Sequence, residues 1–224
     1  MPSRKEPFVT GNIYHIFNKT IDRKRVFQQD TYARAFYDRL IYYRSTQAII
    51  SFSNLPRLKS KDLQYLKIKI DSKEHFQVEV FNYCLMPNHY HLLVKQLRDD
   101  GVKNFMSKTT NSFTRYLNVR EKRQGQIFLK DFKAQRIISD EQLMHISRYI
   151  DLNYYSSGLV SNLEDLTRLT WLGFPAYLGI KKDSLVNANP ILGMFKDKQE
   201  YKEFVFTRAE YQKELAYIKQ FEKA

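Results

Sequence analysis

The sequence predicts an α+β fold, namely a ferredoxin-like antiparallel sheet with helices on one face, followed by a C-terminal helical extension. The first observation is the order of periodic segments, which is strand, helix, two strands, helix, strand and a final helix. The second is the turn pair Pro87-Asn88, which joins the two middle strands as a hairpin. The third is composition, because 224 residues with 43% hydrophobic side chains can bury one sizeable core.

The first half of the chain contains one strand, one helix and the hairpin. Residues 12–17 alternate in polarity as a half-buried strand does. Asp30 is placed to cap a helix that runs to about Arg44. The inward side of this helix is predicted to hold Ala33, Phe36, Tyr37, Leu40 and Ile41. Residues 76–85 and 89–94 are the two strands of the hairpin.

The second half contains a helix, a strand and a further helix. Residues 102–120 are predicted to be helical, with an apolar side formed by Val102, Phe105, Met106, Phe113, Tyr116 and Leu117. Residues 134–138 are predicted to form the fourth strand. Ser139, followed three residues later by Gln142, is a capping box, which predicts the start of a helix over residues 139–155.

The same pattern predicts the organisation of the chain into one domain and an extension. We expect the domain to occupy residues 1–160, with an insertion at residues 51–74. Residues 161–224 are the helical extension, in which residues 197–206 predict one helix. A later helix is predicted by the spacing of Tyr211, Leu215, Ile218 and Phe221.

The charge of the chain favours a polyanionic partner. The net charge is +13 and the isoelectric point is near 9.6. Residues 195–224 hold seven Lys or Arg and six Asp or Glu, so the tail contributes little of this excess. Simple solubility is the alternative reading of a basic surface. A membrane surface is less favoured, because no long basic amphipathic helix is evident.

Cysteine usage and absent motifs narrow the class further. The single cysteine, Cys84, excludes an internal disulfide, and no apolar run approaches the roughly 18 residues of a spanning helix. A reducing cytoplasmic location is therefore expected. The sequence has no Cys-x-x-Cys, Walker A or GxGxxG pattern, which argues against zinc ribbons, P-loop NTPases and dinucleotide enzymes.

Two histidines flank one tyrosine at the start of the strand 89–94. Because side chains alternate along a strand, His89, His91 and Leu93 share one face, while Tyr90 faces the other way. Such a pair of imidazoles can bind a divalent metal and leave other coordination positions open. A half-buried strand with two hydrogen-bonded histidines is the alternative.

A polar ridge on the helix 139–155 adds to this pattern. His145, Tyr149 and Asn153 are each four residues apart, beside an apolar stripe of Leu143, Ile146 and Ile150. A tyrosine on such a ridge can act as a nucleophile, and an amide one turn later can offer an oxygen to a metal. Taken alone the ridge is weak support, since most of the 16 tyrosines are expected to be structural.

Several segments together resemble the REP-associated tyrosine transposases, a branch of the single-tyrosine HUH transposase superfamily. The two main ones are MPNHYHLLV at residues 86–94 and RYIDLN at residues 148–153. Others occur in the expected order, including YHIFNK at residues 14–19 and TRYLN at residues 114–118, and the resemblance spans roughly residues 11–206. The insertion at residues 51–74 departs from the family pattern, as does Asn153-Tyr154-Tyr155, where the family usually has Asn-Pro and a basic residue.

The resemblance implies a function and a site. It makes residues 1–160 an HUH-type transposase or nuclease catalytic domain, in which Tyr149 attacks DNA and forms a covalent 5′-phosphotyrosine. His89 and His91 would hold one Mg²⁺ or Mn²⁺ ion, with Asn153 as third ligand by its position in the motif. His145 is a possible auxiliary group for proton transfer. The free 3′-OH would allow a second DNA end to be joined without ATP.

The implied partner is single-stranded or hairpin DNA of the kind found in repetitive extragenic palindromes, bound by a monomer or homodimer. Phe113, Phe128 and Phe132 could stack on unpaired bases, although core packing is the better reading of each one singly. The basic residues expected to bind DNA are Arg23, Lys24, Arg25, Lys108, Arg115, Arg120, Lys130, Lys133 and Arg136.

The sequence thus favours a metal-dependent, single-strand-specific DNA endonuclease and strand transferase. Two alternatives remain: a hairpin-binding protein without catalysis, and a metal hydrolase that uses the histidine pair and an activated water. Tyr116 is the rival nucleophile, but it lies on the apolar side of its helix. His15 is expected to pack in the sheet, with a possible role beside the site.

Overall fold

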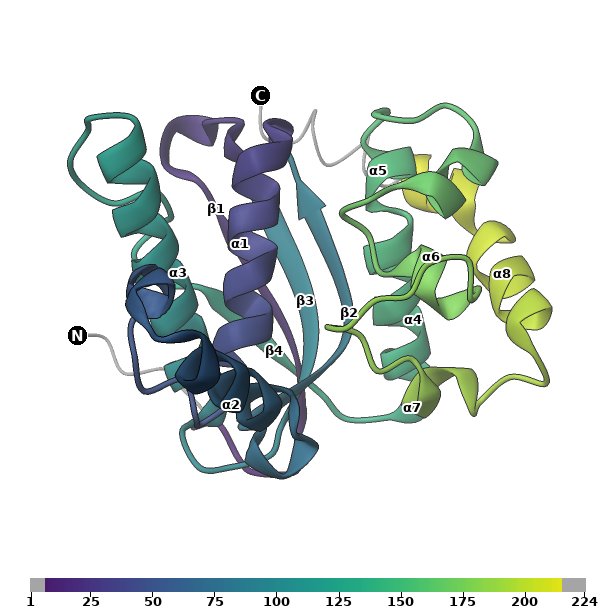
Figure 1. Cartoon of the computed structure of the whole chain (residues 1–224). Coiled ribbons are helices and arrows are strands. Elements are labelled where there is room, and N and C mark those ends of the chain that lie inside the picture. The colour runs from purple at the N-terminus through teal and green to yellow at the C-terminus, as the bar shows by residue number, and fades with distance from the viewer. Residues whose placement is uncertain (1–6, 215–224) are drawn as a thin grey trace.

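The computed structural model describes residues 7–214 and contains one four-stranded antiparallel sheet (Figure 1). The strands are β1 (Ile13–Lys19), β2 (Val78–Met86), β3 (His89–Gln96) and β4 (Lys133–Ile137). Their order across the sheet is β2-β3-β1-β4. This order, with a helix after β1 and another after β3, confirms the predicted ferredoxin-like α+β fold.

Helices α1 (Asp30–Tyr43) and α3 (Gly101–Arg120) cover one face of the sheet (Figure 1). Alternate strand residues such as Ile16, Tyr90 and Leu92 point toward them and are fully buried. The aromatic side chains Phe27, Phe36, Tyr90, Phe113 and Phe128 pack together in this core, with ring centroids 5.0 to 6.1 Å apart. Phe113 and Phe128 therefore stabilise the fold and are not available to stack on bases, whereas Phe132 is only partly buried.

The opposite face of the sheet is covered on its β2 side by α4 (Asp140–Asp151) and the segments that follow it (Figure 1). These segments include α5 (Asn153–Ser156), α6 (Phe174–Tyr177), α7 (Asn189–Leu192) and α8 (Lys198–Phe206). Cys84 and Leu93 of the sheet, Ile150 of α4, and Tyr201 and Val205 of α8 belong to one buried cluster. The C-terminal helices thus pack directly behind the helix that carries Tyr149. No helix among residues 7–214 has the length and apolar character needed to cross a bilayer.

Most helix and strand limits lie within one or two residues of the prediction, and the exceptions have local causes. Asp30 does not cap α1, because its carboxylate accepts a hydrogen bond from Trp171 Nε1 at 2.8 Å and Gln29 occupies the cap position. The helix predicted over residues 139–155 is divided between α4 and α5 at Leu152. Of the last predicted helix, Tyr211 lies within a helical turn, while Leu215, Ile218 and Phe221 fall outside the described residues.

The segment predicted as an insertion, residues 51–74, is folded. It forms a 3-10 helix (Phe52–Arg57), then α2 (Ser60–Asp71) and a short 3-10 helix (Lys73–His75) before β2 begins. Phe52, Leu55 and Leu66 pack against the core beneath α1 and α3. The segment therefore adds a wall beside α1 and α3 and leaves the order of the sheet unchanged.

A buried polar network holds α4 in place. Asp151 accepts hydrogen bonds from Asn82 Nδ2 at 2.8 Å and from the Tyr201 hydroxyl at 2.5 Å. Ser147, one turn earlier on α4, shares a hydrogen bond of 2.7 Å with the same Tyr201 hydroxyl and accepts another from Asn82 at 3.0 Å. The network joins β2, α4 and α8, so the orientation of α4 depends on the C-terminal segment.

This network predicts a specific pH dependence of stability. Burial raises the pKa of Asp151 to about 7, above the roughly 3.9 of an unfolded aspartate. The folded state therefore binds the Asp151 proton more tightly than the unfolded state does. The stabilisation of the folded state by this proton is fully present below the pKa of the unfolded chain, and it is lost as the pH rises through about 7. Asp151→Asn keeps the shape without the charge. Relative to this variant, the free energy of unfolding of the wild type should fall by a few kcal/mol between about pH 5 and pH 8.5, because a pKa difference of one unit between the two states is worth about 1.4 kcal/mol. Urea unfolding across this range measures the difference, and parallel pH profiles would contradict it.

Candidate active site

The register of β1 against β3 gathers the histidines on the sheet face opposite α1 and α3. His15 pairs with Leu93, Phe17 with His91, and Lys19 with His89. Residues directly opposite one another in an antiparallel pair project on the same side, so all of these side chains share one face. Lys133 of β4 lies opposite Phe17 and joins this face from the other edge.

The protein engages the Nδ1 atom of each predicted metal-binding histidine. His91 Nδ1 is 2.9 Å from His15 Nε2, and the two rings are nearly parallel with centroids 5.2 Å apart. His89 Nδ1 is 2.8 Å from Asn88 Oδ1, to which it donates. The rings of His89 and His91 lie 5.1 Å apart between centroids. Because both Nδ1 atoms are held by the protein, the Nε2 atoms are the ones that can face a ligand, and the contacts fix the orientation of both rings.

The electrostatic setting keeps these imidazoles neutral. Burial lowers the pKa of His15 to about 4, and burial together with the charge of Lys19 lowers the pKa of His89 to about 4. The pKa of His91 lies well below the usual value, because of its burial first and then its neighbours His15, His89 and Lys19. At neutral pH each ring therefore keeps a lone pair, which is the form that binds a metal or accepts a proton.

Tyr149 lies beside His91 and His15. Its ring meets His91 and His15 edge to face, with centroids 5.5 and 5.9 Å apart. The buried residues Leu143 and Ile150 turn the other side of α4 toward the core, which leaves Tyr149 on the site side and 37% exposed. Burial raises the pKa of the Tyr149 phenol above its usual value, so the hydroxyl is protonated at neutral pH and needs a proton acceptor to become a nucleophile.

The other two predicted site residues make contacts elsewhere. Asn153 is buried at the start of α5, where its Nδ2 donates to the backbone oxygen of Tyr149 at 2.7 Å. Among residues 7–214 no hydrogen bond uses its Oδ1, and none joins it to His89 or His91. His145 is exposed, and its Nδ1 lies 2.6 Å from Arg148 Nη2. The roles of Asn153 and His145 remain predictions.

The histidine pair fits a divalent metal ion. Two neutral imidazoles, each oriented by a partner on its far nitrogen, are suitable ligands for such an ion. The described part of the chain contains no group of three or more His, Cys, Asp or Glu side chains arranged to hold a metal. Further ligands would therefore be an amide oxygen such as that of Asn153, a water molecule or a phosphate oxygen. A site with such open positions is of the catalytic and not the structural kind.

The predicted DNA-binding residues divide between the two faces of the sheet. The basic turn Arg23-Lys24-Arg25 is beside the Pro87-Asn88 turn, because Thr20 and Phe27 on either side of it donate hydrogen bonds to the backbone oxygens of those two residues. Lys133 is on the same face as the histidines. Lys130 follows Leu129, whose backbone N–H donates a hydrogen bond to the backbone oxygen of Lys19. The sequence predicted each of these cations as a DNA-binding residue except Lys19. Lys19 is exposed and has an interaction partner within the chain.

The remaining four predicted DNA-binding residues lie away from the histidines. Lys108 and Arg115 line a cavity on the α1 and α3 side. Arg120 is exposed at the end of α3, and Arg136 is exposed on β4 opposite Tyr14, whose side chain lies in the α1 and α3 core. The predicted set therefore forms two surfaces and not one.

Sequence reasoning underestimated His15 and missed Phe17 and Lys19. Alternation along residues 12–17 does place His15 and Phe17 on one strand face. That this is the face of His89 and His91 follows only from the pairing of β1 with β3, and the hydrogen-bonded residues His15 and His91 are 76 positions apart. A predicted hairpin alone does not specify that pairing.

The chain matches one family model. The family model described as "Transposase IS200 like" matches residues 8–153, which include the histidine pair, Tyr149 and Asn153. No curated protein matches the chain.

The solved structure of a REP-associated tyrosine transposase bound to a REP hairpin aligns with a TM-score of 0.56 and 14% identity, over 84% of this chain and 98% of that one. A candidate transposase from Deinococcus radiodurans R1 aligns with a TM-score of 0.36 and 14% identity, over 66% of this chain and 95% of that one. A bacterial tRNA(His) guanylyltransferase-like protein in complex with ATP aligns with a TM-score of 0.40 and 9% identity, over 90% of this chain and 94% of that one.

The family match and the fold of the first structure confirm the resemblance to REP-associated tyrosine transposases that the sequence predicted. The family match alone covers well over half of the chain. The protein belongs to the IS200-like transposase family.

Proposed function

We propose that this protein is a metal-dependent enzyme that cuts and rejoins single-stranded DNA beside a hairpin, through a covalent 5′-phosphotyrosine at Tyr149. The observation that carries this proposal is the position of Tyr149, whose ring contacts His91 and His15 on the open part of the sheet. A structural tyrosine would not need to face two neutral, oriented imidazoles. Membership of a transposase family supports the same reaction class.

The reaction would proceed by direct displacement at phosphorus. The Tyr149 oxygen forms a bond to the phosphorus atom while the bond from phosphorus to the 3′ oxygen breaks. The phenolic proton passes to a neighbouring base or water, and the departing 3′ oxygen ends as a hydroxyl. Attack of a 3′-OH on the phosphotyrosine reverses the step and joins DNA without ATP. A Mg²⁺ or Mn²⁺ ion held by His89 and His91, with Asn153 as third ligand, would polarise the phosphoryl oxygens.

The surroundings of the site support DNA as the substrate. The basic turn Arg23-Lys24-Arg25 lies beside the turn that precedes His89, and Lys133 projects from the same face as the histidines. Together with the net charge of +13 these cations can neutralise the phosphates of a DNA strand that crosses the site. We propose single-stranded DNA with a hairpin as the partner, and cytoplasmic action by a monomer or homodimer.

The test is a search for a covalent protein–DNA adduct. A hairpin with single-stranded flanks, labelled at its 3′ end, is incubated with the protein and Mn²⁺ and analysed on a denaturing gel. The labelled 3′ fragment should migrate with the protein, because a 5′-phosphotyrosine retains that fragment, and EDTA should suppress the shift. A blunt duplex of the same sequence serves as the control and should give no adduct. Cleavage without an adduct would indicate a hydrolase that uses water. Binding without cleavage would indicate a non-catalytic hairpin-binding protein.

A further inference from the structure

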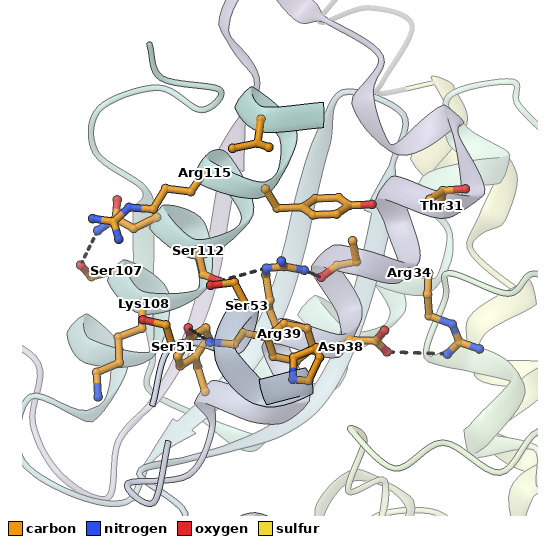
Figure 2. Close-up of a pocket in the computed structure, with 17 residues that line it drawn as sticks. Thr31, Arg34, Asp38, Arg39, Ser51, Ser53, Ser107, Lys108, Ser112 and Arg115 are labelled. Carbon is orange, nitrogen blue, oxygen red and sulfur yellow. Dashed lines mark hydrogen bonds and ion pairs between the residues drawn. The ribbon is translucent and has the colours of Figure 1, made fainter. Parts of the chain in front are cut away.

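A large cavity lies on the side of the sheet away from the histidines. It has a volume of about 810 Å³, is open to solvent, and is bounded by α1, α3 and the 3-10 helix Phe52–Arg57 (Figure 2). This volume is within the roughly 300–1,000 Å³ of sites that take small molecules. The side chains that matter for its chemistry are Arg34, Arg39, Phe52, Lys108, Arg115 and Tyr116.

The charge of the cavity wall is strongly positive. Four of its lining residues are cationic and one, Asp38, is acidic. Asp38 lies 3.9 Å from Arg34, so its charge is already matched. Lys108 and Arg115 are exposed, and within residues 7–214 neither forms an ion pair. The cavity therefore offers three cations to an anionic ligand.

Arg39 is the least accessible of these cations. It is 4% exposed, its Nε donates to Ser112 Oγ at 3.1 Å, and its Nη1 donates to the Ala35 backbone oxygen at 2.7 Å. Across the described residues no carboxylate lies within ion-pair distance of its guanidinium, and no hydrogen bond uses its Nη2. Asp38 attracts the Arg39 guanidinium electrostatically but forms no ion pair with it. A largely buried cation without an ion-pair partner is costly, and an anion that enters the cavity would reduce that cost.

Aromatic rings flank the same guanidinium. The Arg39 Cζ atom is 4.6 Å from the centroid of the Phe52 ring and 4.7 Å from that of Tyr116. Both aromatic side chains are only partly buried and both line the cavity. Rings that alternate with cations are the combination that binds unpaired nucleotides, because bases stack on the rings and phosphates pair with the cations.

We propose that this cavity binds unpaired nucleotides of the DNA strand, with phosphates on Arg39, Lys108 and Arg115 and a base against Phe52 or Tyr116. The inference deepens the proposed function, because it takes DNA as the substrate. The proposal also assigns a role to the insertion, because Phe52 and Pro56 of residues 51–74 form one wall of the cavity.

The cavity is connected to the active-site side along the end of α3. Val119 lines the cavity, and Glu121, two residues later, forms an ion pair with Lys24 of the basic turn. That turn lies beside Pro87-Asn88, just before His89. The end of α3, where Arg120 is exposed, thus joins the rim of the cavity to the basic turn beside the active site.

The test uses a fluorescent oligothymidylate of about ten nucleotides, within the roughly 4–16 nucleotides of single-strand sites. The double variant Lys108→Ala with Arg115→Ala should bind it about tenfold more weakly than the wild type, since two phosphate contacts are lost. The matched control is Lys59→Ala with Lys61→Ala, which removes the same charge from exposed positions within the insertion that do not line the cavity. The control should bind within about twofold of the wild type, because only general attraction changes.

A second measurement on the wild type avoids dependence on folded variants. Oligothymidylate that carries 4-thiothymidine should cross-link on irradiation to peptides that contain Phe52 or Tyr116. Equal affinities of the two double variants, or cross-links that map only to other peptides, would overturn the cavity as a binding site. Thymidine monophosphate that competes as well as the oligonucleotide would overturn the DNA strand as its occupant.

The two proposals fail separately in these experiments. If the wild type forms the phosphotyrosine adduct on hairpins while loss of Lys108 and Arg115 leaves oligothymidylate binding unchanged, the cavity proposal alone is wrong. If the wild type cross-links oligothymidylate through the cavity but never forms the adduct, the proposed cleavage alone is wrong.

Discussion

Replacement of His89 or His91 by alanine should abolish cleavage and adduct formation while most of the affinity for hairpin DNA remains. Each substitution removes one of the two oriented, neutral imidazoles that fit a divalent ion, and the basic turn and Lys133 are untouched. Loss of charge stabilisation at phosphorus is worth several kcal/mol, so the cleavage rate should fall by roughly 10³-fold or more. Cleavage rates and Mn²⁺ titration calorimetry of each variant measure the effect.

His15 provides a graded comparison for this prediction. Its Nε2 is 2.9 Å from His91 Nδ1, so His15→Ala should leave both predicted ligands present but His91 poorly oriented. Metal affinity should then fall by about 10–100-fold, and not be lost entirely. Thermal unfolding of all variants separates this effect from loss of the fold, since His15 and His91 are both buried. A double variant of His89 and His91 that bound Mn²⁺ as the wild type does would show that the metal assignment is wrong.

Local patterns were sufficient to predict the helices and strands and the placement of the main candidate site residues on them. The alternation at residues 89–94 places His89 and His91 on one face of a strand, and the spacing of four along α4 places Tyr149 beside the buried stripe. These patterns depend on neighbours within a few residues. The structure then brings Tyr149 and His91 together, with ring centroids 5.5 Å apart.

Features that depend on distant pairs were not predictable in this way. The Asp30 carboxylate suits a helix cap, yet it bonds to Trp171 Nε1, 141 residues away, and no local signal indicates that competitor. Asp151 is a polar residue in a helical pattern, and only the packing of β2 and α8 against α4 makes it the centre of a buried network. Likewise, Arg39 is one cation among many until Phe52 of the insertion lies against it.

The network around Asp151 has a consequence for the nucleophile. Ser147 and Asp151 flank Tyr149 on α4, and both are fully buried and bonded to Tyr201 of α8. Asn153, after Tyr149, donates to the Tyr149 backbone oxygen. The backbone that carries the phenol is therefore held on both sides by the core of the same chain. This arrangement lets the ring stay over the histidines without a hydrogen bond from its own hydroxyl to any residue in the described part of the chain.

Tyr149→Phe should abolish the covalent adduct and DNA cleavage while the fold, metal binding and hairpin affinity are kept. The substitution removes one oxygen from a side chain that is 37% exposed, and that oxygen has no hydrogen-bond partner among residues 7–214. The free energy of unfolding should therefore change by no more than about 0.5 kcal/mol. Because the lost atom is the one that attacks phosphorus, cleavage should fall by roughly 10³-fold or more.

The matched controls are other tyrosines that lose only their hydroxyl. Tyr154 donates to the Leu85 backbone oxygen, Tyr155 bonds to Glu210, and Tyr116 lies beside Arg39, so none of the three hydroxyls is assigned to the reaction. Phenylalanine at each of these positions should leave the adduct in place, with at most a modest loss of stability. Mass mapping of the wild-type adduct should identify the peptide that contains Tyr149. An adduct on another tyrosine would overturn that assignment. An active Tyr149→Phe enzyme would overturn the mechanism, because this variant keeps the histidine pair but lacks the oxygen that attacks phosphorus.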